Sequence, residues 1–140
     1  MFVVDASVAV KWLVPEERRR EAMEFMTGAG TFLAPDIIVT EVSSALSRKA
    51  RLRQISPAIA EEALSAWMSA IRRGVFVLGQ SVDLVEESFR LSLALDHPLP
   101  DCFYLAFALR VGGVLVTADE KLARKAGEIQ GVEVRLLGKV

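Results

Sequence analysis

Five short apolar runs, each bounded by glycine, proline or polar residues, constrain the fold of this chain more than any other feature. Such runs predict buried strands: FVVD (2–5), TFLAP (31–35), VFVL (75–78), GVLVT (113–117) and VEVRLL (132–137). The stretches between them predict helices over residues 17–26, 37–52, 57–73, 82–95, 101–111 and 121–129. This alternation predicts an α/β fold with a largely parallel five-stranded sheet and helices on both faces.

The composition is that of one folded domain spanning residues 1–140. The chain is 52% hydrophobic and 25% charged, so it has enough apolar side chains for a core. Its apolar runs are far shorter than the roughly 20 residues of a membrane-spanning helix, and Asp5 interrupts the first of them. One cysteine and one histidine exclude an internal disulfide and the usual structural zinc sites. We therefore expect a cytoplasmic protein without a membrane segment.

Four acidic residues are predicted to meet at one edge of the sheet. Asp5 closes the first strand, and one residue separates Asp119 from the fourth. Asp101 opens a helix whose next eight residues, CFYLAFAL, are apolar and therefore buried. Glu41 lies beside the core-facing stripe of the helix over 37–52. In an open α/β sheet, ligands bind beyond the carboxyl ends of the strands, so these acids predict a site there.

Each acid also has a simpler interpretation. Aspartate is a favoured N-cap, so Asp5, Asp101 and Asp119 are each compatible with capping the helix that follows. Glu41 is compatible with a boundary residue whose carboxylate reaches water. Four independent placements at one edge favour a shared site over four separate explanations.

Such a cluster requires a counter-charge. Carboxylates about 4 Å apart repel by roughly 4 kcal/mol per pair at an effective dielectric constant of 20. Oxygen-only ligands fit Mg²⁺, or Mn²⁺ in its place, and these cations bind phosphodiesters and activate water without a histidine. We expect Asp5 and Asp101 to be direct ligands, and Glu41 and Asp119 to complete the shell. The nearby hydroxyls of Ser7 and Thr117 are candidates to orient a carboxylate or a phosphate, or are ordinary cap and strand-end groups.

Three other side chains have competing interpretations. His97 stands before Pro98 in a predicted loop, and we expect its ring to be solvated rather than catalytic. Trp12 and Trp67 have the chemistry to stack on bases, but packing in the core or an interface is favoured. An interface that buries Trp67 against a partner is one hypothesis for the helix over 57–73.

Four segments resemble the PIN domain, and particularly the VapC-type toxins of bacterial toxin–antitoxin pairs. They are VVDASVAVKWL, PDIIVTEVSSAL with Glu41, DCFYLAFAL with Asp101, and VLVTADEKLARKA with Asp119. The resemblance implies an endoribonuclease dependent on Mg²⁺ or Mn²⁺, a four-acid active site, a homodimer and a VapB-type antitoxin. Two positions depart from the family pattern, which often has Asn at position 44 and Tyr at position 100. Here they hold Ser44 and Pro100, and both departures concern fine positioning and substrate choice.

Other classes fit less well. A haloacid-dehalogenase-like phosphatase needs a second Asp where Ser7 stands, and a receiver domain needs an acid pair and a strand-end lysine that the sequence lacks. No glycine-rich turn follows FVVD, which argues against a P-loop or dinucleotide site. A degenerate, non-catalytic PIN-like binding or structural module remains the alternative.

Basic residues suggest where RNA approaches, although the net charge is only −1. Each basic cluster alone is typical of a solvated helix face or a helix C-terminus. If RNA is the substrate, some of them line the path to the acids and hold the phosphate backbone. The candidates are Arg48, Arg51, Arg53, Lys121 and Arg124.

Overall fold

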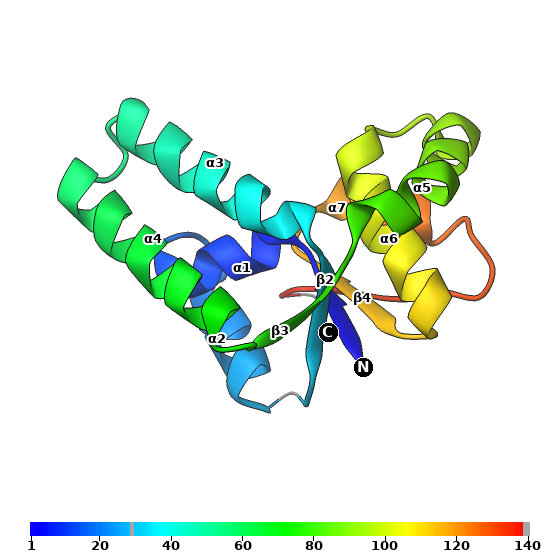
Figure 1. Cartoon of the computed structure of the whole chain (residues 1–140), viewed down its shortest axis with the longest axis horizontal. Coiled ribbons are helices and arrows are strands. Elements are labelled where there is room, and N and C mark those ends of the chain that lie inside the picture. Colours follow the sequence, from blue (N-terminus) through cyan, green and yellow to red (C-terminus); the bar gives the residue numbers. More distant parts are fainter. Residues whose placement is uncertain (29, 139–140) are drawn as a thin grey trace.

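Strands and helices alternate in the computed structural model, which describes residues 1–28 and 30–138 (Figure 1). The strands are β1 (Phe2–Val4), β2 (Phe32–Pro35), β3 (Phe76–Gly79), β4 (Val114–Thr117) and β5 (Glu133–Leu136). The helices are α1 (Ala6–Leu13), α2 (Arg19–Gly28), α3 (Ile37–Arg51), α4 (Pro57–Arg72), α5 (Ser81–Leu95), α6 (Leu99–Val111) and α7 (Glu120–Ala126). None of these helices combines the length and apolar character needed to span a lipid bilayer.

The five strands form one parallel sheet in the order β3-β2-β1-β4-β5, as the sequence predicts. Val3 of β1 lies at the centre, paired with Leu33 of β2 on one side and Leu115 of β4 on the other. Helices α1 to α4 cover one face, and α5 to α7 cover the other (Figure 1). This division follows from right-handed crossovers. The chain crosses the sheet in one direction from β1 to β3 and in the opposite direction from β3 to β5, so the connecting helices lie on opposite faces.

Helix α1 is the one element that the sequence analysis missed. It begins directly after β1, with Asp5 as its N-cap, and is only eight residues long. Its valines at positions 8 and 10 favour strands, so the apolar segment around Asp5 has no clear helical signal. Tertiary packing decides the conformation, since Val8 to Trp12 are buried beneath α2 and α3.

Helix α6 is buried on every side along most of its length. All residues from Cys102 to Ala108 are buried, because α6 contacts β1, β2 and β4 on one side and α5 on the other. The helix ends at Gly112, which adopts the left-handed conformation (φ 64°) at the C-cap. The packing of α6 against the sheet and α5 holds its first turn, with Asp101, at the carboxyl edge of the sheet.

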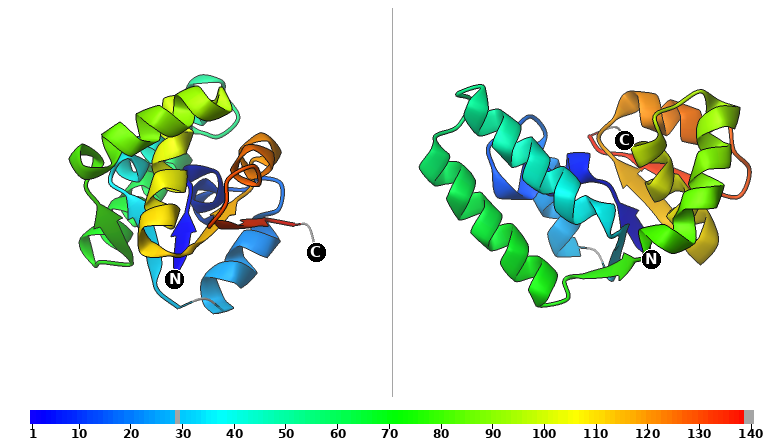
Figure 2. Two further views of the ribbon diagram at one scale, coloured as in Figure 1. Left: turned by 90° about the vertical axis from the view of Figure 1, so that its right-hand side faces the viewer. Right: turned by 45° about the horizontal axis from the view of Figure 1, so that its top comes forward.

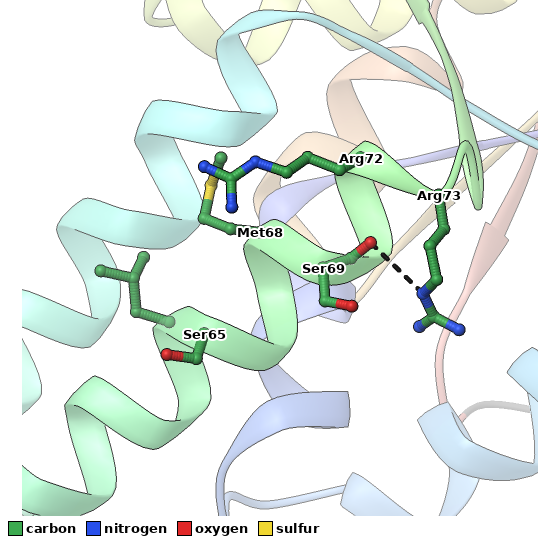
Figure 3. A pocket seen from close by; sticks show the side chains of 6 residues that line it. Ser65, Met68, Ser69, Arg72 and Arg73 are labelled. Atoms are coloured by element: carbon green, nitrogen blue, oxygen red, sulfur yellow. Dashed lines mark hydrogen bonds between the residues drawn. The ribbon is translucent and has the colours of Figure 1, made fainter.

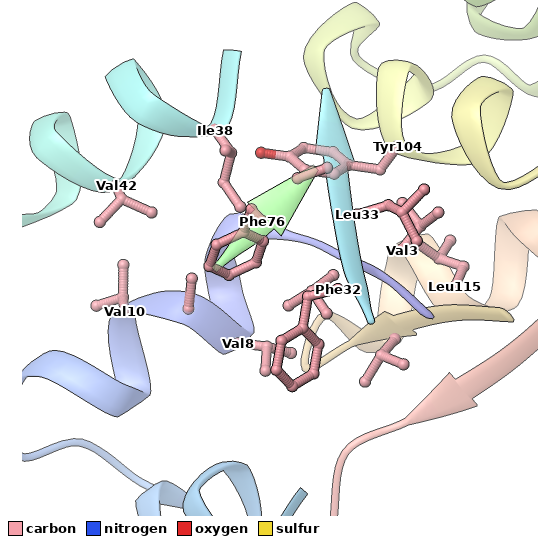
Figure 4. Packing of buried hydrophobic residues seen from close by; sticks show 14 of the residues in the cluster. Val3, Val8, Val10, Phe32, Leu33, Ile38, Val42, Phe76, Tyr104 and Leu115 are labelled. Atoms are coloured by element: carbon pink, nitrogen blue, oxygen red, sulfur yellow. The ribbon is translucent and has the colours of Figure 1, made fainter. Parts of the chain in front are cut away.

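An aromatic cluster fills the core between the sheet and helices α1 and α4. The Phe76 ring lies 5.5 Å from that of Trp67 and 5.6 Å from that of Trp12. Phe32 packs against Phe76 on the sheet (Figure 4). Trp67 is only 1% exposed. The hypothesis that Trp67 contacts a partner is therefore wrong, because the chain's own core already buries it.

Helices α3 and α4 form an antiparallel hairpin that extends beyond the sheet (Figures 1 and 2). Ser56 caps α4 by accepting a hydrogen bond from the Ile59 amide, and Pro57 follows at the first helical position. The hairpin begins with Ile37 at the carboxyl edge of the sheet, so Glu41 lies near that edge while the C-terminal end of α3 lies far from it.

A candidate acidic active site at the carboxyl edge of the sheet

The topology places two of the four acids at the point where the strand order reverses. Strands β1 and β4 are neighbours, and the chain leaves them toward opposite edges of the sheet. Asp5 follows β1 and Asp119 follows β4, so both stand at this switch point, where open α/β sheets bind ligands. Helices α3 and α6 bring Glu41 and Asp101 to the same edge.

Asp5 is the most deeply buried of the four acids, with 4% of its surface exposed. Burial raises the pKa of its carboxyl to about 6, and the charge of Asp101 adds to the rise; three hydrogen bonds oppose it. Two go to Oδ1, from the Ser7 hydroxyl (2.5 Å) and the Val8 amide (3.2 Å), and the Thr117 hydroxyl donates to Oδ2. Asp5 therefore caps α1, as the simpler interpretation expects, and also faces the acidic edge.

Ser7 and Thr117 join the ends of β1 and β4 through Asp5. While donating to its carboxylate, the Ser7 hydroxyl accepts from the Ala118 amide (3.0 Å) and the Thr117 hydroxyl accepts from the Asp119 amide (3.0 Å). Both hydroxyls thus orient the Asp5 carboxylate. The same bonds fix the backbone that carries Asp119.

Asp101 does not cap its helix. It is the third residue of α6, whose N-cap is Pro98, and its Oδ2 atom lies 2.7 Å from Nε2 of His97. The expectation that His97 is solvated is wrong, since its side chain is only 2% exposed. Partial burial raises the pKa of Asp101; His97 opposes the rise, Asp119 adds to it and Lys121 opposes it.

Glu41 is half-buried and pairs with a residue that the sequence analysis did not identify. The Tyr104 hydroxyl donates to Oε1 of Glu41 across 2.6 Å. Figure 4 shows the Tyr104 side chain reaching from α6 toward α3. Burial raises the pKa of Glu41; the bond from Tyr104 opposes the rise and the charge of Asp101 adds to it.

Asp119 caps α7. Its Oδ1 atom accepts from the amides of Lys121 (2.9 Å) and Leu122 (3.2 Å), which confirms the capping interpretation for this residue. Capping thus applies to Asp5 and Asp119 and fails for Asp101, where the carboxylate points to a histidine instead of its own helix.

Asp101 is the electrostatic centre of the four acids. Its charge raises the pKa of Asp5 and of Glu41, and its own pKa is raised by Asp119. Within residues 1–28 and 30–138, no three acidic, histidine or cysteine side chains are close enough to form a preassembled metal cluster. The four acids therefore share one edge and interact through their charges, without closing into a tight ring.

The donor set nonetheless fits a hard divalent cation. Asp101, Glu41 and Asp119 are each held through one oxygen, and in the described part of the chain the other oxygen accepts no hydrogen bond. Both oxygens of Asp5 accept hydrogen bonds, but Oδ2 accepts only that of Thr117 and keeps a second lone pair. A cation would find carboxylate oxygens only, which are the ligands that Mg²⁺ and Mn²⁺ prefer. It would also relieve the repulsion that helps to raise the pKa values of Asp5, Glu41 and Asp101.

The predicted RNA-binding residues fall into two groups. Lys121 is close enough to Asp101 for its charge to lower the pKa of that acid, and Arg124 lies one turn further along α7. The second group, Arg48, Arg51 and Arg53, is exposed near the end of α3. The helical rise places the first two roughly 10 and 15 Å beyond Glu41 along the axis. Ser44 is exposed one turn after Glu41, in a groove with Thr40 and Ser47.

His97 and Tyr104 are the functional candidates that sequence reasoning missed. For Tyr104 the available signal was helical spacing, because it follows Asp101 by three residues on the same helix. His97 lies in the link before α6, so helical spacing gives no signal for it. Burial raises the pKa of the neighbouring Cys102 thiol to about 11, which disfavours the thiolate that a cysteine–histidine nucleophile requires.

A separate pocket lies on the outer face of α4 (Figure 3). It has a volume of about 440 Å³ and is lined by Leu64, Ser65, Met68, Ser69, Arg72 and Arg73. Arg73 donates from Nε to the Ser69 carbonyl oxygen (3.3 Å). None of the four acids lines this pocket, so it is distinct from the acidic edge.

Similarity to known proteins identifies the family of this chain. The chain matches the PIN domain over residues 2–128. It is 30% identical over 127 residues to ribonuclease VapC3 of Pyrobaculum aerophilum, an alignment that covers 89% of this chain and 93% of that protein.

Two crystal structures share the fold. PAE2754 from Pyrobaculum aerophilum has a TM-score of 0.68 and 23% identity, covering 95% of this chain and 87% of that one. The sarcin–ricin loop cleaving toxin VapC20 of Mycobacterium tuberculosis has a TM-score of 0.71 and 17% identity, covering 89% and 94%. The chain belongs to the PIN domain family and is a homologue of its VapC-type ribonucleases.

Proposed function

We propose that this protein, with residues 1–140 as a single PIN domain, is an endoribonuclease dependent on Mg²⁺ or Mn²⁺ and the toxin of a VapBC-type pair. The acidic edge carries the proposal, because four carboxylates from separate elements lie at the same edge of the sheet, two of them at the switch point, and Asp101 interacts electrostatically with the other three. Similarity to ribonuclease VapC3 supports the same reaction.

The residues of the site have distinct proposed roles. Asp5 and Asp101 are the direct ligands of the cation, and Glu41 and Asp119 complete its shell. A bound divalent cation supplies charge stabilisation at the phosphate and lowers the pKa of water. Ser7 and Thr117 hold the Asp5 carboxylate, and Tyr104 holds Glu41, whose raised pKa suits it to accept a proton from the attacking water.

RNA binding is assigned to the basic residues on two sides of the acidic edge. Lys121 of α7 lies close to Asp101 and Arg124 follows one turn later, and both would contact phosphates beside the scissile bond. Arg48, Arg51 and Arg53 would contact the backbone further along the strand. Ser44 would contribute a hydroxyl between the acids and this second group.

Two protein partners belong to the proposal. A VapB-type antitoxin would neutralise the enzyme in the cytoplasm, and exposed Ile59 and Leu64 offer apolar surface on α4 for such a partner. A second copy of the chain would dimerise through α5. That helix exposes four apolar residues at helical spacing on the face opposite α6: Val82, Val85, Phe89 and Leu93.

Cleavage of a labelled RNA mixture by the partner-free protein tests the function. We expect cutting in Mg²⁺ and in Mn²⁺, none in EDTA, and none by Asp101→Asn in either metal. Asp83→Asn is the matched control, since it makes the same change on the exposed surface of α5. Equal cutting by the wild type and Asp101→Asn would contradict the proposal.

The alternative, a degenerate PIN-like module, predicts no cutting of any RNA and no binding of Mn²⁺. Titration of Mn²⁺ into the wild type and Asp101→Asn separates it from a highly selective nuclease. Binding that the variant loses would keep the nuclease proposal, and its absence in both proteins would favour the module.

A further inference from the structure

His97 lies in a link between α5 and α6 whose backbone is tightly held. The His97 amide donates to the Ser92 carbonyl oxygen (3.1 Å), and the Ser92 hydroxyl donates to the His97 carbonyl oxygen (2.6 Å). Asp96 before it adopts the left-handed conformation (φ 49°), and Pro98 after it has a fixed φ. The position from which the His97 side chain projects is therefore fixed.

The two ring nitrogens have different surroundings. Nε2 faces Oδ2 of Asp101 at 2.7 Å, whereas Nδ1 is buried and has no hydrogen-bond partner among residues 1–28 and 30–138. A carboxylate only accepts, so the nitrogen facing it must carry the proton. The network thus assigns the Nε2–H tautomer, with a lone pair on Nδ1.

This arrangement is unfavourable for a purely structural residue. A buried polar atom without a partner destabilises a fold, and an apolar side chain of similar size would fill the same space without that cost. The hydrogen bond to Asp101 is the one feature that a leucine at this position would lose. This hydrogen bond therefore explains the presence of a histidine at position 97, which packing alone does not explain.

The carboxylates of the other three acids are each held in place by hydrogen bonds that do not involve His97. Asp5 is held by three donors, Glu41 by the Tyr104 hydroxyl, and Asp119 by two backbone amides. Asp101 is held by His97 alone among the described residues. Without that bond, the carboxylate at the electrostatic centre of the site would be the only one free to rotate.

We propose that His97 is the positioning residue of Asp101: its Nε2–H holds Oδ2 and leaves Oδ1 as the oxygen presented to the cation. The inference rests on the proposed function, because it concerns how the acidic edge binds its metal. Loss of such an outer partner typically weakens metal binding 10- to 100-fold.

Three variants separate positioning from structure. His97→Leu removes the donor, and His97→Gln restores an N–H at about the position of Nε2. Ser92→Ala loosens the same link without touching the bond to Asp101. Mn²⁺ affinity is measured in the absence of RNA, by electron paramagnetic resonance of the free ion, and thermal melts in EDTA report stability.

We expect His97→Leu to weaken Mn²⁺ binding at least 10-fold while its melting temperature stays within a few degrees of wild type. His97→Gln and Ser92→Ala should remain within about threefold of the wild-type affinity. Wild-type affinity in His97→Leu, or equal losses in all three variants, would overturn the positioning role and leave the proposed function intact. A wild type that neither binds Mn²⁺ nor cuts RNA would overturn both.

The single histidine of the chain allows a direct check on the geometry. In ¹⁵N-edited spectra of the metal-free, untagged protein, the imidazole signals should be those of the Nε2–H tautomer. An Nδ1–H tautomer would contradict the hydrogen bond and overturn the inference, whatever the metal affinity.

Discussion

The Tyr104 hydroxyl donates to Glu41 across 2.6 Å and thereby joins α6 to α3 over the carboxyl edge of the sheet. Tyr104 is 1% exposed, so its ring is fixed by the core, and Glu41 takes its orientation from it. Asp101 lies one turn earlier on the same helix. One buried helix therefore provides one acid and positions a second.

Replacing Tyr104 by phenylalanine should impair the reaction more than the fold. The ring remains in the core, and Oε1 of half-buried Glu41 can bind water instead, so we expect a loss of about 1 kcal/mol in the free energy of unfolding. RNA cleavage should fall roughly tenfold, since an oriented proton acceptor contributes about 10²- to 10⁴-fold and only its orientation is lost.

The pH dependence of Tyr104→Phe provides a sharper readout. The bond from Tyr104 lowers the pKa of Glu41, so its removal should raise that pKa further. Activity that requires ionised Glu41 is lost as pH falls, and the acid limb of the rate profile should move to higher pH. A profile that falls uniformly without this displacement would contradict the role of the hydrogen bond.

The buried Asp5 carboxyl should make the metal-free protein less stable at neutral pH than near pH 4. Its pKa is about 6 in the fold, compared with about 3.9 in an unfolded chain, so the folded state binds more protons between these values. The free energy of unfolding therefore decreases as pH rises from about 4 to about 6. In EDTA, Asp5→Asn should be more stable than the wild type at pH 7, by up to roughly 3 kcal/mol, and equally stable near pH 4.

Melting temperatures across this range, with and without Mn²⁺, check that prediction. Asparagine can still accept from the Val8 amide, so the cap of α1 is kept. Mn²⁺ should stabilise the wild type more than Asp5→Asn, because the cation offsets the charge that the variant lacks. A lower melting temperature for Asp5→Asn at pH 7 in EDTA would show that ionised Asp5 stabilises the fold.

The sequence indicates where the acids and the Ser7 and Thr117 hydroxyls stand, but not the contacts of Tyr104 and His97 with two of the acids. Asp5, Asp119 and Asp101 stand where strands end or a helix begins, and this information is local. The bond between Tyr104 and Glu41 joins residues 63 positions apart, and the burial of His97 depends on how α5 and α6 fold around their link. Helix α1 was missed for a similar reason, because its helicity depends on packing under α2 and α3.

Charge reversal should reveal which basic group holds RNA. In an Asp101→Asn background, which we expect to bind RNA without cutting it, Lys121→Glu with Arg124→Glu should weaken RNA binding and flatten its salt dependence by about 0.7 per lost phosphate contact. Arg48→Glu with Arg51→Glu should do the same only for RNA long enough to reach the end of α3. Arg20→Glu, on exposed α2, is the control. Unchanged binding at low salt in both pairs would exclude these residues.

The apolar face of α5 should control the oligomeric state. Val82, Val85, Phe89 and Leu93 are 40–75% exposed and recur every three or four residues, while Leu84, Ser88 and Leu95 face the fold. Phe89→Lys puts a charge at the middle of the exposed face and leaves the buried face unchanged. Size exclusion with light scattering should therefore give a dimeric wild type and a monomeric Phe89→Lys variant with the same melting temperature in dilute solution.

Ile59→Lys makes the matching change on α4 and should remain dimeric. A monomer from Ile59→Lys and a dimer from Phe89→Lys would move the interface to α4, the helix that we assign to the antitoxin.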